Sequence, residues 1–152
     1  MKDTQRTLLL FGLITMAIAT VCAEDDRAMK KDMAQLQGQW SMVSGSADGY
    51  VMPDGMRGNS QRVCKGDETT VTVGGQLFMK AKFTIDPSRK PKTIDYQMID
   101  GPTKGKKQMG IYELDGDTVK FCCGPVGAER PADFTSKPGD GRTLSVWKRE
   151  KK

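Results

Sequence analysis

Short stretches in which apolar and polar residues alternate recur along most of the chain. The clearest stretch covers residues 76–85, where the apolar side chains fall on every second position, Leu77, Met79, Ala81, Phe83 and Ile85, and Phe78 alone breaks the polar side. Such alternation is typical of a strand with one buried face and one solvated face. Similar patterns predict seven further strands, at residues 39–44, 61–65, 69–73, 93–99, 108–114, 118–123 and 143–149.

Most segments between these predicted strands are short and rich in turn residues. Gly74-Gly75 and Asp115-Gly116 are tight hairpin signals, and the only long loops cover residues 45–59 and 124–141. Nearly uniform hairpin connections favour an all-β, eight-stranded antiparallel up-and-down barrel over a β-sandwich, which usually needs long crossing connections. A barrel of eight strands is just wide enough to be filled by its own side chains or to hold one small ligand.

The first 23 residues have the composition of a secretory signal peptide. Lys2 and Arg6 precede an apolar stretch at residues 7–20, and small residues lead up to Ala23. The apolar stretch is too short for a comfortable membrane span, so we expect no stable span once the signal is removed. We therefore expect cleavage after Ala23 and export to the periplasm, the cell envelope or the medium. A lipid anchor on Cys22 is disfavoured because Val21 precedes it, where Gly, Ala or Ser is usual.

A short helix is predicted at residues 24–37, before the barrel domain at 38–150 and a basic tail at 151–152. Met29, Met33 and Leu36 recur at helical spacing, and Gly38 ends the pattern. We expect the apolar stripe of this helix to lie across one end of the barrel.

The two ends of the predicted barrel carry a characteristic pair of residues. Gly38-x-Trp40 opens the first strand, and Arg149 ends the last one. This pair resembles the lipocalin signature, in which the Trp closes one barrel end and a late Arg packs over its ring. A cation over an indole face is favourable by about 0.5–2 kcal/mol.

Longer segments are similar to an uncharacterised lipocalin-like domain family abundant in Planctomycetes. These segments are LQGQW (36–40), TVTVGG (70–75), DPSRKPKTID (86–95), GIYELDGDT (110–118) and ERP through KPG (129–139). The resemblance covers roughly residues 36–150 and implies a small exported barrel. It implies no catalytic or binding residue.

Charge and composition exclude several kinds of chemistry. The chain has no histidine, which removes Ser-His and Cys-His nucleophile pairs and the commonest zinc ligand. Asp115 and Asp117 fit a tight hairpin better than a calcium site. The net charge of +5 comes from scattered cations without a row of exposed aromatics, which argues against nucleic-acid binding. We predict a protein that is not an enzyme and needs no metal or cofactor.

Three cysteines remain after the predicted cleavage. Strand alternation places Cys64 and Cys122 on the outer face, and Cys123 on the inner face with Phe121. Because Cys64 and Cys122 then lie on well-separated strands, we expect no disulfide between them.

Two groups of side chains are candidates for ligand binding. Tyr50, Met52 and Met56 lie on the loop at 45–59, where they would form a flexible apolar lid. Five others are predicted to point into the barrel: Met79, Phe83, Tyr96, Met98 and Phe121. The sequence leaves open whether these five line a cavity or fill a solid core.

We expect an exported lipocalin-like protein that binds a small apolar or amphipathic ligand. The alternative is a non-catalytic cell-envelope interaction module with a solid core.

Overall fold

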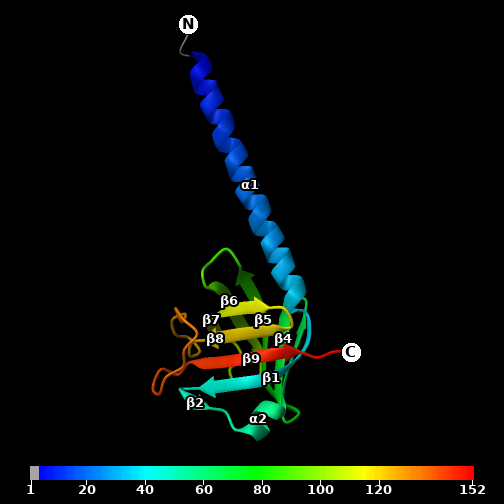
Figure 1. Ribbon diagram of the computed structural model, residues 1–152. Coiled ribbons are helices and arrows are strands. Elements are labelled where there is room, and N and C mark those ends of the chain that lie inside the picture. The colour runs from blue at the N-terminus through cyan, green and yellow to red at the C-terminus, as the bar shows by residue number, and fades with distance from the viewer. Residues whose placement is uncertain (1–3) are drawn as a thin grey trace.

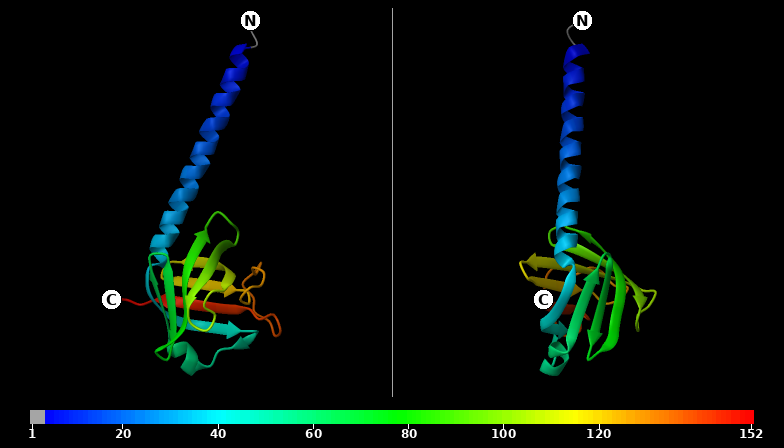
Figure 2. Two further views of the ribbon diagram at one scale, coloured as in Figure 1. Left: turned by 180° about the vertical axis from the view of Figure 1, so that it is seen from behind. Right: turned by 90° about the vertical axis from the view of Figure 1, so that its right-hand side faces the viewer.

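In the computed structural model, a long helix projects from one end of a closed β-barrel (Figures 1 and 2). The structure describes the backbone of residues 4–152 and the side chains from residue 19 onward. In chain order, the elements are α1 (Thr4–Leu36), β1 (Gly38–Ala47), β2 (Tyr50–Val51), α2 (Asp54–Gly58), β3 (Ser60–Lys65), β4 (Glu68–Val73), β5 (Gln76–Asp86), β6 (Lys92–Asp100), β7 (Lys107–Asp115), β8 (Thr118–Cys123) and β9 (Thr143–Arg149).

The barrel consists of eight antiparallel strands, each paired with its neighbours in sequence. Strands β1 and β3 to β9 follow one another around the wall, and pairing of β9 with β1 closes it. This confirms the predicted up-and-down barrel, and all eight predicted strands are present with small changes at their ends. Strand β2 is an additional two-residue strand on the edge of β1, and it lies with α2 inside the loop predicted at 45–59.

The first and last strands meet at the end of the barrel next to α1. Trp40 pairs with Arg149 across the two strands, and the guanidinium carbon of Arg149 lies 4.3 Å from the centroid of the indole. Arg149 Nη1 also donates to the carbonyl of Gln37 at 2.6 Å. Gly38 has φ of +112°, and a Cβ there would lie 3.2 Å from Arg149 Nη1. Glycine at position 38 therefore permits both the turn out of α1 and the close approach of the arginine.

Among the described side chains of α1, those in the C-terminal turns contact the barrel. Leu36 belongs to the barrel core, and its carbonyl accepts a hydrogen bond from Trp40 Nε1 at 3.1 Å. Asp32 is buried and accepts hydrogen bonds from the Tyr112 hydroxyl and from Lys92 Nζ, both at 2.7 Å. The helix begins at Thr4, so it includes most of the predicted signal peptide, of which residues 1–3 lie outside the described part. Of the helices described, none is long and apolar enough to cross a membrane.

The long loop between β8 and β9 covers part of the outer wall. Ile111 and Cys122 are buried there, outside the core of the barrel, and the Cys122 thiol donates to the carbonyl of Thr135 at 3.5 Å. Arg130 Nη1 donates to the carbonyls of Ile94 at 3.2 Å and Gly110 at 2.7 Å. The prediction that Cys122 faces outward is therefore correct, but the thiol is covered by the loop.

Candidate functional site

The structure gathers five of the eight predicted ligand-binding residues inside the barrel. Met79, Phe83, Tyr96, Met98 and Phe121 are all buried in its core.

The three predicted lid residues lie elsewhere. Tyr50 is 67% exposed and Met56 is 45% exposed, so both lie outside the barrel interior. Met52 is half-buried, and its sulfur lies beside Gly45 of β1. The structure therefore separates Tyr50 and Met56 from the interior set, while Met52 packs at the barrel end opposite α1.

Strand β3 presents polar side chains to the interior, a feature that its sequence pattern does not predict. Arg62 and Cys64 are buried, at 5% exposure each, whereas Val63 is 41% exposed. The prediction that Cys64 faces outward is therefore wrong. Pairing sets the orientation, because Arg62 lies opposite Trp40 of β1 and Val71 of β4, which both face inward.

The side chain of Arg62 reaches into the interior and contacts side chains from both flanks of β3. Its guanidinium carbon lies 4.4 Å from the ring centroid of Phe121 on β8 and 4.9 Å from that of Trp147 on β9. Nη1 donates to Thr69 Oγ1 at 3.2 Å and to the Tyr96 hydroxyl at 3.4 Å. Nε is buried, and among the described residues it has no hydrogen-bond partner.

The guanidinium of Arg62 carries a charge that no described carboxylate neutralises. Burial lowers the pKa of Arg62, and its interactions with Tyr96, Cys64 and Cys123 raise it by more at the alkaline pH at which those groups ionise. At neutral pH the guanidinium is charged because arginine is not deprotonated in proteins. Burial also raises the pKa of the Tyr96 phenol, and it raises the pKa of the Cys123 thiol to about 12. Both groups are therefore protonated and uncharged at neutral pH.

The contacts around Arg62 are of the same size as the cost of burying it, but they leave one of its donors unpaired. Removing an ion from water costs several kcal/mol even after the protein relaxes. A cation over an aromatic ring returns about 0.5–2 kcal/mol, and the two hydroxyl acceptors add about 1.5–3 kcal/mol each at best. Nε is still unsatisfied and no carboxylate of the described residues pairs with the guanidinium, so one donor is available to a further acceptor.

Methionines surround the interior at the barrel end opposite α1. Met79 and Met98 lie on the neighbouring strands β5 and β6. The sulfurs of Met42 and Met52 pack beside Gly45, where a Cβ would lie 2.9 Å and 2.7 Å from them, respectively. Unbranched thioether side chains repack easily, so this end of the interior is adaptable.

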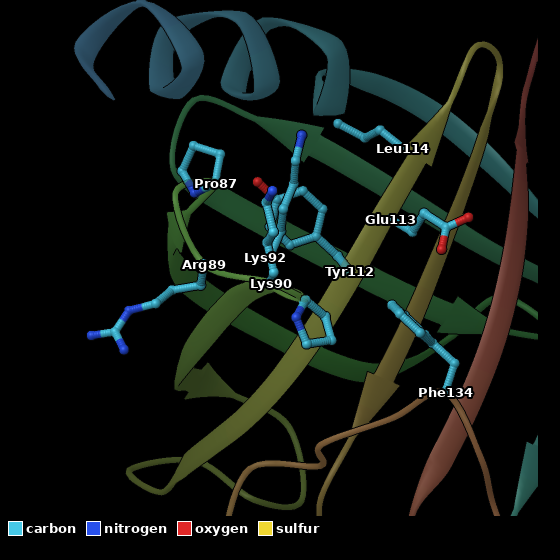
Figure 3. A pocket seen from close by; sticks show the side chains of 9 residues that line it. Pro87, Arg89, Lys90, Lys92, Tyr112, Glu113, Leu114 and Phe134 are labelled. Atoms are coloured by element: carbon cyan, nitrogen blue, oxygen red, sulfur yellow. The ribbon is translucent and has the colours of Figure 1, made fainter. Parts of the chain in front are cut away.

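A separate pocket of about 240 Å³ lies at the rim of the barrel beside α1 (Figure 3). It is lined by Pro87, Arg89, Lys90, Pro91, Lys92, Tyr112, Glu113, Leu114 and Phe134. Most of its polar groups already have partners: Lys92 and Tyr112 bind Asp32, and Arg89 pairs with Asp86 at 3.3 Å. Burial and the hydrogen bond to Asp32 raise the pKa of Tyr112. We therefore regard the interior around Arg62 as the stronger candidate site.

The described part of the chain contains neither a candidate metal site nor a disulfide. No three side chains of His, Cys, Asp or Glu converge there closely enough to hold a metal ion. All four cysteines are unpaired.

Comparison of the chain with models of protein families, with curated proteins and with solved structures gives no match.

Proposed function

We propose that this protein is exported and binds a small amphipathic molecule inside its barrel. The observation that supports binding is the mixed composition of the barrel interior, where Arg62, Thr69 and Tyr96 share the core with aromatic and methionine side chains. Ligand sites typically combine apolar walls with a few convergent polar groups. A barrel interior that served only as a core would be expected to be apolar.

Entry of the ligand would take place at the end opposite α1. The end next to α1 is covered by Leu36 and by the stacked pair of Trp40 and Arg149. At the other end, Met42 and Met52 can change rotamers to admit a ligand, because their side chains are long and unbranched.

Binding is a better proposal than catalysis for this interior. The Cys123 thiol, with its pKa raised to about 12, is a poor nucleophile at neutral pH. Export is supported by the composition of residues 1–23 and by the resemblance to exported lipocalin-like barrels.

The binding proposal is tested with a neutral apolar fluorescent probe, N-phenyl-1-naphthylamine. We expect saturable binding of one probe per chain, weakened about tenfold or more in Met98→Trp, because the larger ring fills the interior. The matched control is Met109→Trp on β7, where the side chain is 39% exposed, and this variant should bind as the wild type does. Thermal melts would establish that both variants fold. No saturable binding, or equal losses in the two variants, would exclude an interior site.

A second candidate function is the capture of a protein partner at strand β2. Tyr50 is 67% exposed and Val51 is 74% exposed, on a two-residue strand at the edge of the sheet. Exposed edges pair readily with an extended segment of another chain. A photo-crosslinking residue at position 51 should then trap a partner in the producing cells, whereas one at the exposed Val43 should not.

A further inference from the structure

We infer that the ligand of the barrel is a monoanion, a carboxylate on an apolar body, and that Arg62 binds its charged end. This inference rests on the proposed binding function and adds the chemical class of the ligand. It depends on the surroundings of Arg62, whose guanidinium is buried among aromatic rings and lacks a charged partner in the described residues.

The unpartnered atom of Arg62 defines the kind of group that would complete the site. Nε is a buried donor for which no described residue provides an acceptor. Together with one terminal nitrogen it forms a planar edge that binds carboxylates through two parallel hydrogen bonds. The hydroxyl of Tyr96 accepts a hydrogen bond from Nη1 and keeps its own proton for donation. A carboxylate oxygen is therefore a suitable acceptor for both residues.

Charge balance favours a single negative charge over a phosphate. Arg62 is the only cationic side chain buried in the described part of the barrel core. One guanidinium neutralises one carboxylate, whereas a dianionic phosphate would leave a negative charge in an apolar interior. The aromatic rings beside Arg62 and the methionines elsewhere in the core then suit the apolar body of the same molecule.

The test compares decanoate with 1-decanol, two probes of equal chain length of which only one is charged at pH 8. Each is titrated against the purified full chain by displacement of N-phenyl-1-naphthylamine. We expect the wild type to bind decanoate about tenfold or more tightly than decanol, because an arginine–carboxylate pair is a strong, charge-assisted contact. In Arg62→Met this preference should disappear through loss of decanoate binding alone, while decanol binding changes little.

Two arginine variants serve as controls for charge and location. Arg89→Met removes a cation from the rim pocket, and Arg27→Met removes one from the exposed part of α1. Both should keep the preference for decanoate. Arg62→Lys retains the charge without the planar fork and should keep part of it. Thermal melts provide a second readout: decanoate should raise the melting temperature of the wild type and of Arg62→Lys, but not that of Arg62→Met.

The outcomes separate this inference from the function on which it rests. Equal binding of acid and alcohol by the wild type, or loss of the preference in Arg89→Met instead of Arg62→Met, would overturn the inference and leave an apolar binding site in place. If the wild type binds neither probe and not the fluorescent reporter, the proposed function fails, and the inference fails with it. An unliganded Arg62→Met that melts far below the wild type would also contradict it, since the guanidinium would then be a structural part of the core.

Discussion

Two arginines of this barrel face tryptophan rings, but their remaining contacts differ. Arg149 lies over Trp40 at the rim, donates to the carbonyls of Gln35 and Gln37, and pairs with Asp117 at 3.3 Å. Arg62 lies over Trp147 in the interior and has only hydroxyl acceptors. The contacts of Arg149 satisfy its donors and stabilise the fold, whereas those of Arg62 leave a donor available.

Replacing Arg149 by methionine should destabilise the barrel. The change removes the cation–π contact and leaves the carbonyls at the C-terminus of α1 without their donors. We expect the free energy of unfolding to fall by about 2–3 kcal/mol, measured by urea denaturation. The neighbouring Lys148→Met, on an exposed position, should change it by no more than about 0.5 kcal/mol. A similar small effect in Arg149→Met would mean that strand pairing alone closes the barrel.

The sequence identified Arg149 but not Arg62, and the reason is physical. Arg149 stands at a fixed place in a recognisable pair with Gly38-x-Trp40. Strand β3 has a single aliphatic residue, Val63, so its own pattern suggests the wrong face. Only pairing with β1 and β4 decides the orientation, and that pairing places a charge inside against the usual preference of charged residues for solvent. The pairing of Arg62 with Trp40 on the neighbouring strand is the signal from which its inward orientation could have been inferred.

Among the elements, helix α1 divides into a part that contacts the barrel and a part that does not. Residues 19–27 are exposed, whereas Asp32 and Leu36 are buried against β6, β7 and the core. Removal of residues 1–23, as expected on signal cleavage, should therefore leave the melting temperature within about 2 °C of that of the full chain, because residues 19–23 are exposed to solvent.

A substitution in the part of α1 that contacts the barrel should be more destabilising than this truncation. Asp32→Ala, introduced into either form, removes the shared acceptor of Tyr112 and Lys92 and leaves both polar groups at the barrel end without it. We expect a loss of about 2–3 kcal/mol in either form, measured by thermal and urea unfolding. If truncation is as costly as Asp32→Ala, the exposed part of α1 contributes to the fold in a way that its contacts do not explain.

For the whole molecule, the barrel could be predicted because its determinants are local. Alternation in β5, β6 and β8 and the turns at Gly74-Gly75 and Asp115-Gly116 define strands and hairpins over a few residues each. The position of the loop before β9 could not be predicted in this way. Its contacts with the outer wall, such as Arg130 with the carbonyl of Gly110, join residues whose proximity only the closed barrel creates.

The whole barrel should become less stable at alkaline pH because of titratable groups that are buried in its interior. The pKa of Cys123 rises from its ordinary value of 9.0 to about 12, and burial raises that of Tyr96 above 10.0, because the interior disfavours their charged forms. Since each group holds its proton more tightly when folded, its contribution to stability is complete below the unfolded pKa and is lost as the pH rises above it. We therefore expect the free energy of unfolding to fall from about pH 9 upward, by about 1.4 kcal/mol per pH unit for each group that titrates on unfolding.

Urea unfolding between pH 7 and 11 under reducing conditions measures this slope, and Cys123→Ala should reduce it near pH 9–10. A flat profile up to pH 11 would mean that the thiol and the phenol reach water in the folded state, in which case the interior around Arg62 would be hydrated.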